Sequence, residues 1–417
     1  MISCPLSYTQ LGVITDDPEM TNKYYIKIYL HSSRRFSHLS IGDSYEDFRR
    51  WCEPFDTIEN VKERVEQIMN HHEVLRSTIA FTKEGFSQII HLKSILIQSE
   101  YYIKDKIIPE AYDSLKVPIL LKIIDYDGSF LYRLDMHHVF MDGIGSNIFL
   151  QLFNEYLPNI SPLLQYKDWI KYEQKHSVLE DYPIEDWYQL DLPYRHYSST
   201  LGRVMHSSIQ IDHSLVRSLL IKNRVSSYTI LTSVLFLVLF IWCNQSIIII
   251  NNIYSNRIKP EYQQMLGLFV KIVYLKMNIT QEQTLQEFIQ SLFLNINNVL
   301  SIDDIYYKPN SRLLSVVTNH TKAEHSWVPH KYHKAKYPFL IYTSSSFNNT
   351  NVHFYLSEIL FDKYILKEVT DLYQLIFSLF DKTSHLYELF FIIQTHNSFP
   401  LYKEVRLKNL IDNINII

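Results

Sequence analysis

Two adjacent histidines, an aspartate and a glycine form the group of residues in this sequence whose types and spacing best suit catalysis. His137, His138, Asp142 and Gly143 make the pattern HHxxxDG. An imidazole titrates near neutral pH, so it can take a proton from an attacking amine or hydroxyl, or stabilise the charge that develops. Asp142 could orient an imidazole or pair with a distant arginine, and a glycine lets a ligand approach the backbone closely. The alternative is a histidine pair whose hydrogen bonds are satisfied within a core turn.

The residues around this motif predict that it joins the end of a strand to the start of a helix. Two apolar runs, 117–125 and 129–138, flank a Tyr-Asp-Gly turn, which is typical of a β-hairpin. Alternate residues from Phe130 to Met136 share one face of the second strand, and His138 continues that alternation at the strand's end. An amphipathic helical pattern follows the motif and ends before a proline. From such a loop, side chains can reach a cleft.

Composition argues against several other kinds of site. The 417 residues carry a net charge of −4, which argues against a nucleic-acid binder because phosphate neutralisation requires a basic surplus. The eight glycines form no GxGxxG dinucleotide fingerprint, no GxxxxGK[ST] phosphate loop and no GxSxG nucleophile elbow. The three cysteines are far apart, so we expect neither a disulfide framework nor a metal knuckle. This cysteine usage fits a reducing, cytoplasmic compartment.

Apolar periodicity predicts a mixed chain of strands and helices, and 47% hydrophobic residues suffice for large cores. The most apolar window, 230–243, would rise only about 21 Å as a helix, against about 30 Å for a bilayer core. We therefore expect a buried core helix and no membrane association, and the N-terminus lacks a signal-peptide pattern. Expected strands lie at 23–30, 117–125, 129–138, 203–211, 247–250, 268–277, 313–318, 338–344 and 352–357, and expected helices at 56–72, 144–157, 163–174, 213–222, 228–242, 284–297 and 363–380.

Motifs along nearly the whole chain resemble those of condensation domains of nonribosomal peptide synthetases. These domains belong to the HHxxxDG acyltransferase superfamily, which is related to chloramphenicol acetyltransferase. Besides HHxxxDG, the similar segments are PLSYTQ at 5–10 (family PLSxxQ), HEVLR at 72–76 (HExLR), YKDW at 166–169 (YxDY), SNR at 255–257 (the end of GxPxxxR), GLFV at 267–270 (GMFVN) and, loosely, YPF at 337–339 (FDL).

The resemblance implies an α/β (mixed α+β) fold of two chloramphenicol-acetyltransferase-like lobes that form a V around a central active-site tunnel. The N-terminal lobe would comprise residues 1–178, and the C-terminal lobe, with its crossover segments, residues 179–417. The residues that become candidates for lining the tunnel are Ser255, Asn256, Gly267, Phe269, Tyr342 and Ser344. The chain departs from the family at 251–257, which lacks the family's Gly and Pro, and at Lys271, which replaces an Asn. These departures affect the expected acceptor and subtype more than the expected activity.

The resemblance also implies roles for the motif residues. His138 matches the family's catalytic histidine, a base or positioning residue, whereas His137 matches a mainly structural residue. Asp142 matches a structural residue that forms an ion pair with an arginine, carried here by Arg257. Gly143 matches a residue whose backbone N–H can face the reacting thioester.

The function implied is that of a free-standing condensation enzyme. It would transfer an acyl or aminoacyl group from the phosphopantetheine thioester of a carrier protein, bound in trans, to an amine. The amine would be a small molecule or carrier-bound, no cofactor would be bound permanently, and the chain would be a monomer. One alternative is a CoA- or carrier-dependent O-acyltransferase that forms an ester. Another is a non-catalytic recruitment or scaffold domain of the same fold.

Two further features are less informative. Four histidines and a glutamate lie close together: His320, His325, His330, His333 and Glu324. Their spacing matches no zinc signature, so we expect a polar loop and no metal site. The basic and apolar residues of the tail at 401–417 would suit a short amphipathic helix. That helix would be either an ordinary packed terminus or a docking element for another protein.

Overall fold

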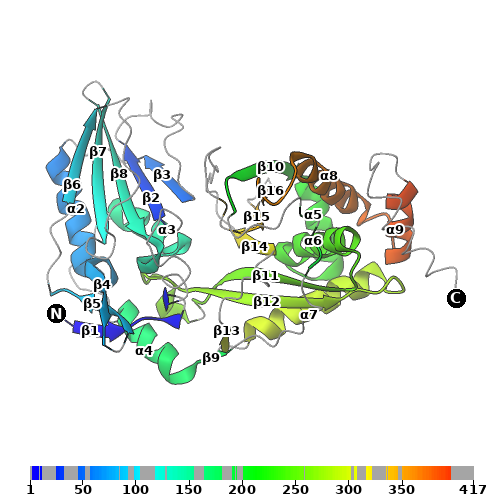
Figure 1. The fold of residues 1–417 in the computed structure, drawn as a ribbon, viewed down its shortest axis with the longest axis horizontal. Helices are drawn as coiled ribbons and strands as arrows, with labels where there is room; N and C mark the ends of the chain where they lie inside the picture. The colour runs from blue at the N-terminus through cyan, green and yellow to red at the C-terminus, as the bar shows by residue number, and fades with distance from the viewer. Residues whose placement is uncertain are drawn as a thin grey trace.

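The predicted hairpin lies at the centre of a sheet in the computed structural model, and the HHxxxDG loop follows its second strand (Figure 1). The described strands of this sheet are β2 (Tyr25–His31), β3 (Glu46–Trp51), β6 (Gln98–Ile103), β7 (Ile119–Tyr126) and β8 (Ser129–His137). Their order is β3-β2-β8-β7-β6, with β7 and β8 antiparallel. The alternation along β8 buries Leu134 and Met136 in the hydrophobic core of this half, as the pattern predicted.

Helices and a smaller sheet complete the N-terminal half. Its elements also include β1 (Ile2–Pro5), α2 (Ile58–His71), η3 (Glu73–Arg76), β4 (Ser77–Thr82), β5 (Gly85–Ile90), α3 (Gly143–Asn154) and α4 (Tyr166–His176). The small sheet has the order β1-β5-β4. Helix α2 buries Val61, Val65 and Ile68, which recur at helical spacing, so the predicted amphipathic helix is confirmed.

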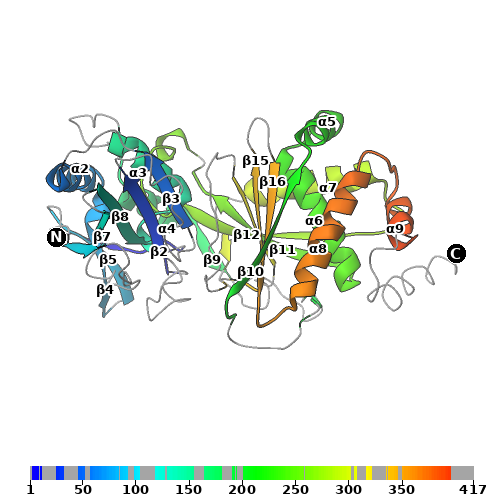
Figure 2. The same cartoon turned by 90° about the horizontal axis from the view of Figure 1, so that it is seen from above.

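A second sheet organises the C-terminal half and carries helices on one side (Figures 1 and 2). Its described strands run in the order β10-β16-β15-β14-β11-β12, with bounds β10 (Val204–Ile211), β11 (Ile247–Ser255), β12 (Val270–Asn278), β14 (Val316–Thr321), β15 (Phe339–Ser345) and β16 (Thr350–Ser357). The helices are α5 (His213–Asn223), α6 (Ser227–Cys243), α7 (Leu285–Ser301), α8 (Lys363–Leu379) and α9 (Leu386–Thr395). Every residue of α6 from Thr229 to Cys243 is buried. The other face of the sheet is turned toward the N-terminal half in both views.

The residues that the structure describes are 2–8, 10–11, 25–31, 46–51, 57–83, 85–92, 98–103, 118–126, 129–154, 164–180, 190–192, 194, 201–257, 259–301, 305–307, 316–321, 335, 337–345 and 350–395. Within these ranges, no single helix is long and apolar enough to cross a membrane. Helices α5 and α6 reach that length and apolar composition only when taken together, and they are bent by 99° relative to each other. The expected division between residues 178 and 179 stays a prediction.

The two halves are joined by the segment that connects β11 to β12. Both strands extend from the C-terminal half toward the N-terminal half (Figure 1). The connecting residues 256–269, which we call the crossover, include the short turn η6 (Pro260–Tyr262). Apolar side chains of the crossover, among them Leu266 and Phe269, belong to the N-terminal hydrophobic core. A parallel pair of short strands, β9 (Val178–Glu180) and β13 (Ile305–Tyr307), adds a second connection.

A buried carboxyl group lies beside this connection. Glu173 of α4 is 1% exposed, and one of its carboxylate oxygens accepts the N–H of Tyr8 at 2.9 Å. Burial raises the pKa of Glu173 to about 7, although Tyr8, Tyr306 and the Lys271 ammonium favour the charged form. Lys271 lies with its Nζ 4.8 Å from the centre of the Tyr306 ring. Residues from four separate segments therefore meet around one carboxyl group.

We predict that Glu173→Gln removes a pH-dependent part of the stability. The native pKa lies above the unfolded value, so the protonated carboxyl stabilises the fold at low pH and this contribution is lost as pH rises through about 7. Between pH 5 and 8, the wild type should lose on the order of 2–3 kcal/mol relative to the variant, measured by urea unfolding. Glu282→Gln, at an exposed position, is the control. An unchanged pH dependence in Glu173→Gln would contradict the assignment.

Candidate active site

The two motif histidines have different environments. His137 is the last residue of β8 and is fully buried, and its Nδ1 accepts the backbone N–H of Val139 at 3.1 Å. His138 begins the short turn η4 (His138–Phe140) and is only partly buried. The strand thus ends one residue earlier than predicted, and the turn carries His138. Of the pair, His138 is the less buried imidazole.

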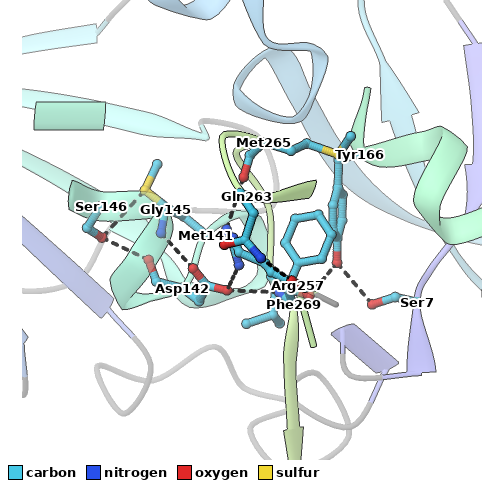
Figure 3. A network of polar contacts seen from close by, with 11 residues as sticks. Ser7, Met141, Asp142, Gly145, Ser146, Tyr166, Arg257, Gln263, Met265 and Phe269 are labelled. Carbon is cyan, nitrogen blue, oxygen red and sulfur yellow. Dashed lines mark hydrogen bonds and ion pairs between the residues drawn. The ribbon is translucent and has the colours of Figure 1, made fainter. Parts of the chain in front are cut away.

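Asp142 ties the motif loop to the crossover through both carboxylate oxygens (Figure 3). Its Oδ1 accepts the N–H of Gly145 at 2.7 Å, at the start of α3. Its Oδ2 accepts the N–H of Phe269 at 3.0 Å and lies 2.6 Å from Nη1 of Arg257. The backbone N–H of Asp142 donates to the carbonyl oxygen of Gly267 at 3.2 Å. Of the two roles that the sequence left open for Asp142, the structure shows the arginine pair.

Arg257 is buried together with its partner. Both side chains are 2% exposed, although 115 residues separate them in sequence. The other terminal nitrogen of Arg257 donates to the carbonyl oxygen of Met265 at 3.0 Å, and the guanidinium lies 4.2 Å from the centre of the Phe269 ring. Gln263 donates an N–H to the carbonyl oxygen of Arg257. The ion pair is therefore shielded from water, and it holds the crossover against the motif loop.

Two glycines permit this close approach. Gly267 has φ +156°, and a Cβ there would lie 2.1 Å from Cδ2 of Tyr166. Gly145 is buried, and a Cβ there would lie 2.6 Å from Cγ of Met141. We did not single out Gly145 in the sequence. Its one signal was a glycine inside a helical pattern, which usually has a packing reason.

The candidate tunnel residues fall into two groups. The first group supports the crossover: Asn256 donates its N–H to the carbonyl oxygen of Phe269 at 2.7 Å, and its side chain donates to the hydroxyl of Tyr306. Phe269 is fully buried, with its ring centre 5.2 Å from that of Tyr166, and Gly267 packs on the same tyrosine. The place of these residues in a tunnel stays a prediction.

Two of the other candidates, Ser255 and Tyr342, lie on the face of the C-terminal sheet opposite its helices. Tyr342 of β15 packs in the small hydrophobic cluster on this face, as does Ile253 of β11, and Ser255 follows Ile253 by two residues at the end of β11. Ser344 is also a residue of β15. Tyr342 lies directly opposite His353 of β16. This face is turned toward the N-terminal half (Figures 1 and 2). The place of these residues along a substrate passage stays a prediction.

We missed a histidine pair on this face in the sequence. Nε2 of His206 lies 3.3 Å from Nδ1 of His353, and the His206 ring stacks on Tyr355 with centres 4.8 Å apart. Burial and repulsion from His353 lower the pKa of His206 to about 4, and burial lowers the pKa of His353. Both imidazoles are therefore neutral at pH 7. They lie 147 residues apart in sequence, so local pattern gave no signal.

Comparison with known proteins places the chain in a family. The family model "Condensation domain" matches residues 53–309. The chain belongs to the condensation-domain family. Condensation domains resemble it in fold across almost its whole length. That of the monacolin K polyketide synthase MokA superposes with a TM-score of 0.68 at 12% identity, covering 93% of this chain and 99% of that one. The starter condensation domain of rhizomide synthetase RzmA gives a TM-score of 0.67 at 10% identity, covering 93% and 96%.

Sequence relatives of this condensation domain are much longer proteins. Bacitracin synthase 1 of Bacillus licheniformis is 24% identical over 212 residues, which are 45% of this chain and 4% of the relative. Surfactin synthase subunit 2 of Bacillus subtilis (strain 168) is 24% identical over 266 residues, 56% of this chain and 7% of the relative. The chain thus matches a small part of each relative. The X-domain from teicoplanin biosynthesis, with a TM-score of 0.70 at 11% identity over 92% of this chain and 96% of that one, shares the fold. The mixed α+β, two-lobed fold class is confirmed.

The remaining sequence features fall largely outside the described residues. This applies to His325, His330, His333 and Glu324, and to the tail at 401–417. His320 lies in β14, with its Nδ1 2.6 Å from Oγ1 of Thr343. Among the residues that the structure describes, no group of three or more His, Cys, Asp or Glu side chains is arranged to hold a metal ion.

We predict that Arg257→Ala destabilises the fold strongly. The change leaves the Asp142 carboxylate buried without its cation, which costs about 3–5 kcal/mol. Urea unfolding measures the loss. Lys222→Ala is the matched control, because it breaks a 3.6 Å pair with Asp381 whose side chains are 60% and 51% exposed. That loss should stay below about 1 kcal/mol. Equal effects of the two substitutions would show that the buried pair contributes no more than a surface pair.

Proposed function

We propose that this condensation domain forms an amide bond by transferring an acyl or aminoacyl group from a carrier-protein phosphopantetheine thioester to an amine. The observation that carries the proposal is the partly buried His138, held on a loop that the buried Asp142–Arg257 pair fixes to the crossover. Family membership supports the reaction class. The rhizomide synthetase domain was crystallised with C8-CoA and Leu-SNAC, an acyl thioester and an aminoacyl thioester, which supports thioester substrates.

The proposed step needs no covalent enzyme intermediate. The amine nitrogen attacks the thioester carbonyl carbon, the C–N bond forms, and the C–S bond breaks to leave a thiolate on the pantetheine arm. His138 takes the proton that the nitrogen loses, or it positions the amine and the departing thiolate takes that proton. A thiolate leaves with little acid catalysis, so alignment of the two reactants supplies most of the gain, up to about 7–11 kcal/mol. The imidazole adds about 10²–10⁴-fold.

The start of α3 suits the charge that develops on the carbonyl oxygen. Gly143 is the first residue of this helix, where backbone N–H groups lack partners within the helix and the helix dipole is positive. We assign the Gly143 N–H to the developing oxyanion. Asp142 accepts the N–H of Gly145, two residues after Gly143 in the same turn, so the carboxylate fixes the direction of this helix end.

We predict that His138→Ala lowers acyl transfer by about 10²–10⁴-fold without loss of fold. The assay incubates acyl-loaded carrier proteins with the chain and free or carrier-bound amines, and follows carrier mass by intact-protein mass spectrometry. His176→Ala, an exposed histidine at the end of α4, is the control and should transfer like the wild type.

The same assay separates the alternatives. Transfer to hydroxyl acceptors in place of amines identifies an ester-forming enzyme. In the reconstituted pathway, with the other enzymes present, product formation that is unchanged in His138→Ala identifies a recruitment domain. The X-domain from teicoplanin biosynthesis, which shares the fold, forms a complex with OxyB. Carrier-bound thioester that is consumed only by wild type and His176→Ala supports the proposal.

A further inference from the structure

We propose that Gln10 is a positioning residue for His138, acting through a closed ring of buried hydrogen bonds. The inference rests on the proposed function of His138. Gln10 lies in the N-terminal segment, far in sequence from the motif, and is fully buried. No part of the mechanism above uses it.

The side chain of Gln10 holds the motif loop directly. Its amide nitrogen donates to the carbonyl oxygen of Val139 at 2.9 Å, next to His138, and to the side-chain oxygen of Gln88 at 3.1 Å. Its side-chain oxygen accepts the N–H of Ser7 at 3.0 Å. Every hydrogen-bonding group of the carboxamide is thus engaged, and its position is fixed from three sides.

From Gln10 the ring continues to the crossover. The Gln10 backbone N–H donates to Oγ of Ser7 at 3.0 Å, and this Oγ lies 3.2 Å from the hydroxyl of Tyr166. The Tyr166 hydroxyl donates its proton to the carbonyl oxygen of Leu268 at 2.7 Å, so Ser7 must donate to Tyr166 (Figure 3). All the donors therefore point the same way along this path, an arrangement that strengthens each bond.

Asp142 closes the ring. Leu268 lies between Gly267, whose carbonyl oxygen accepts the N–H of Asp142, and Phe269, whose N–H donates to the Asp142 carboxylate. The loop from His138 to Asp142 is consequently held at one end by Gln10 and at the other by the crossover. Because Ser7 and Tyr166 connect these two supports, a shift at one is transmitted to the other.

The decisive variant is Gln10→Met, which keeps the volume and removes every side-chain hydrogen bond. We expect kcat for acyl transfer to fall about 10²-fold, while KM stays near the wild-type value, because the loop is displaced but the substrate surfaces are intact. The His138 imidazole signal, observed by NMR of histidine-labelled protein and assigned by its loss in His138→Ala, should shift. This second readout does not depend on activity.

A matched pair of tyrosines provides the control. Tyr166→Phe removes the hydroxyl that donates to Leu268, and Tyr373→Phe removes a buried hydroxyl that donates at 2.8 Å to the carbonyl oxygen of Leu231 in the C-terminal core. Each variant loses one buried hydrogen bond to a backbone carbonyl, and Tyr166→Phe also loses the bond from Ser7, because only Tyr166 belongs to the ring. Tyr166→Phe should lower kcat and move the His138 signal, whereas Tyr373→Phe should change neither.

If Gln10→Met fails to fold, Gln10→Glu tests the same contact. The carboxylate still accepts the Ser7 N–H but repels the Val139 carbonyl oxygen, and once protonated it can donate to that oxygen again. The ratio of variant to wild-type rate should therefore rise as pH falls, and a ratio that stays low at every pH would overturn the proposal. So would effects of Gln10→Met no larger than those of Tyr373→Phe. A His138 signal that moves while the wild type transfers no acyl group would refute only the proposed reaction.

Discussion

The arrangement of this molecule depends on one desolvated ion pair. The Arg257 guanidinium and the Asp142 carboxylate lie 2.6 Å apart and are almost completely removed from water. Each charge in such a site is costly without the other, so the chain must return the crossover to the motif loop to be stable. That requirement fixes where β11 and β12 end, and it determines the side of the N-terminal core on which the crossover packs. The position of the His138 loop is therefore set by the Arg257–Asp142 ion pair.

Local pattern was sufficient for the elements that position the motif. The β7–β8 hairpin and helices α5 to α8 were expected within a few residues of their observed bounds, because their apolar spacing is strong. Strand β11 is longer than expected, since Asn251 and Asn252 follow the isoleucines and broke the apolar run. Within the sheet, the side chain of Asn251 donates to the carbonyl oxygen of Val316, so the polar residue is accommodated by a neighbouring strand. The pattern of residues around Asn251 cannot show that β14 will lie beside it, because Val316 is 65 residues away in sequence.

In the candidate site, too, the residues that are close in sequence could be predicted and those brought together by the fold could not. HHxxxDG could be recognised because its four defining residues are close in sequence, and the partner of Asp142 was named only through the family resemblance. The β4–β5 hairpin, helix α9 and the His206–His353 pair were not anticipated. The histidine pair joins segments 147 residues apart, and β5 also pairs with the remote β1, contacts that periodicity does not encode. The hydrogen bonds of Gln10 belong to the same class, although the segment that carries it was noticed.

The packing of the crossover has a consequence for recombination of such domains. Residues 256–269 come from the second half of the sequence, yet Leu266, Leu268 and Phe269 are core residues of the first half. The ring of Tyr166, which belongs to α4, leaves no room for a side chain at Gly267. A chimera cut between the lobes at a single point would separate these surfaces and mismatch both. The exchangeable unit is therefore discontinuous: the N-terminal half together with the crossover, with junctions placed inside β11 and β12.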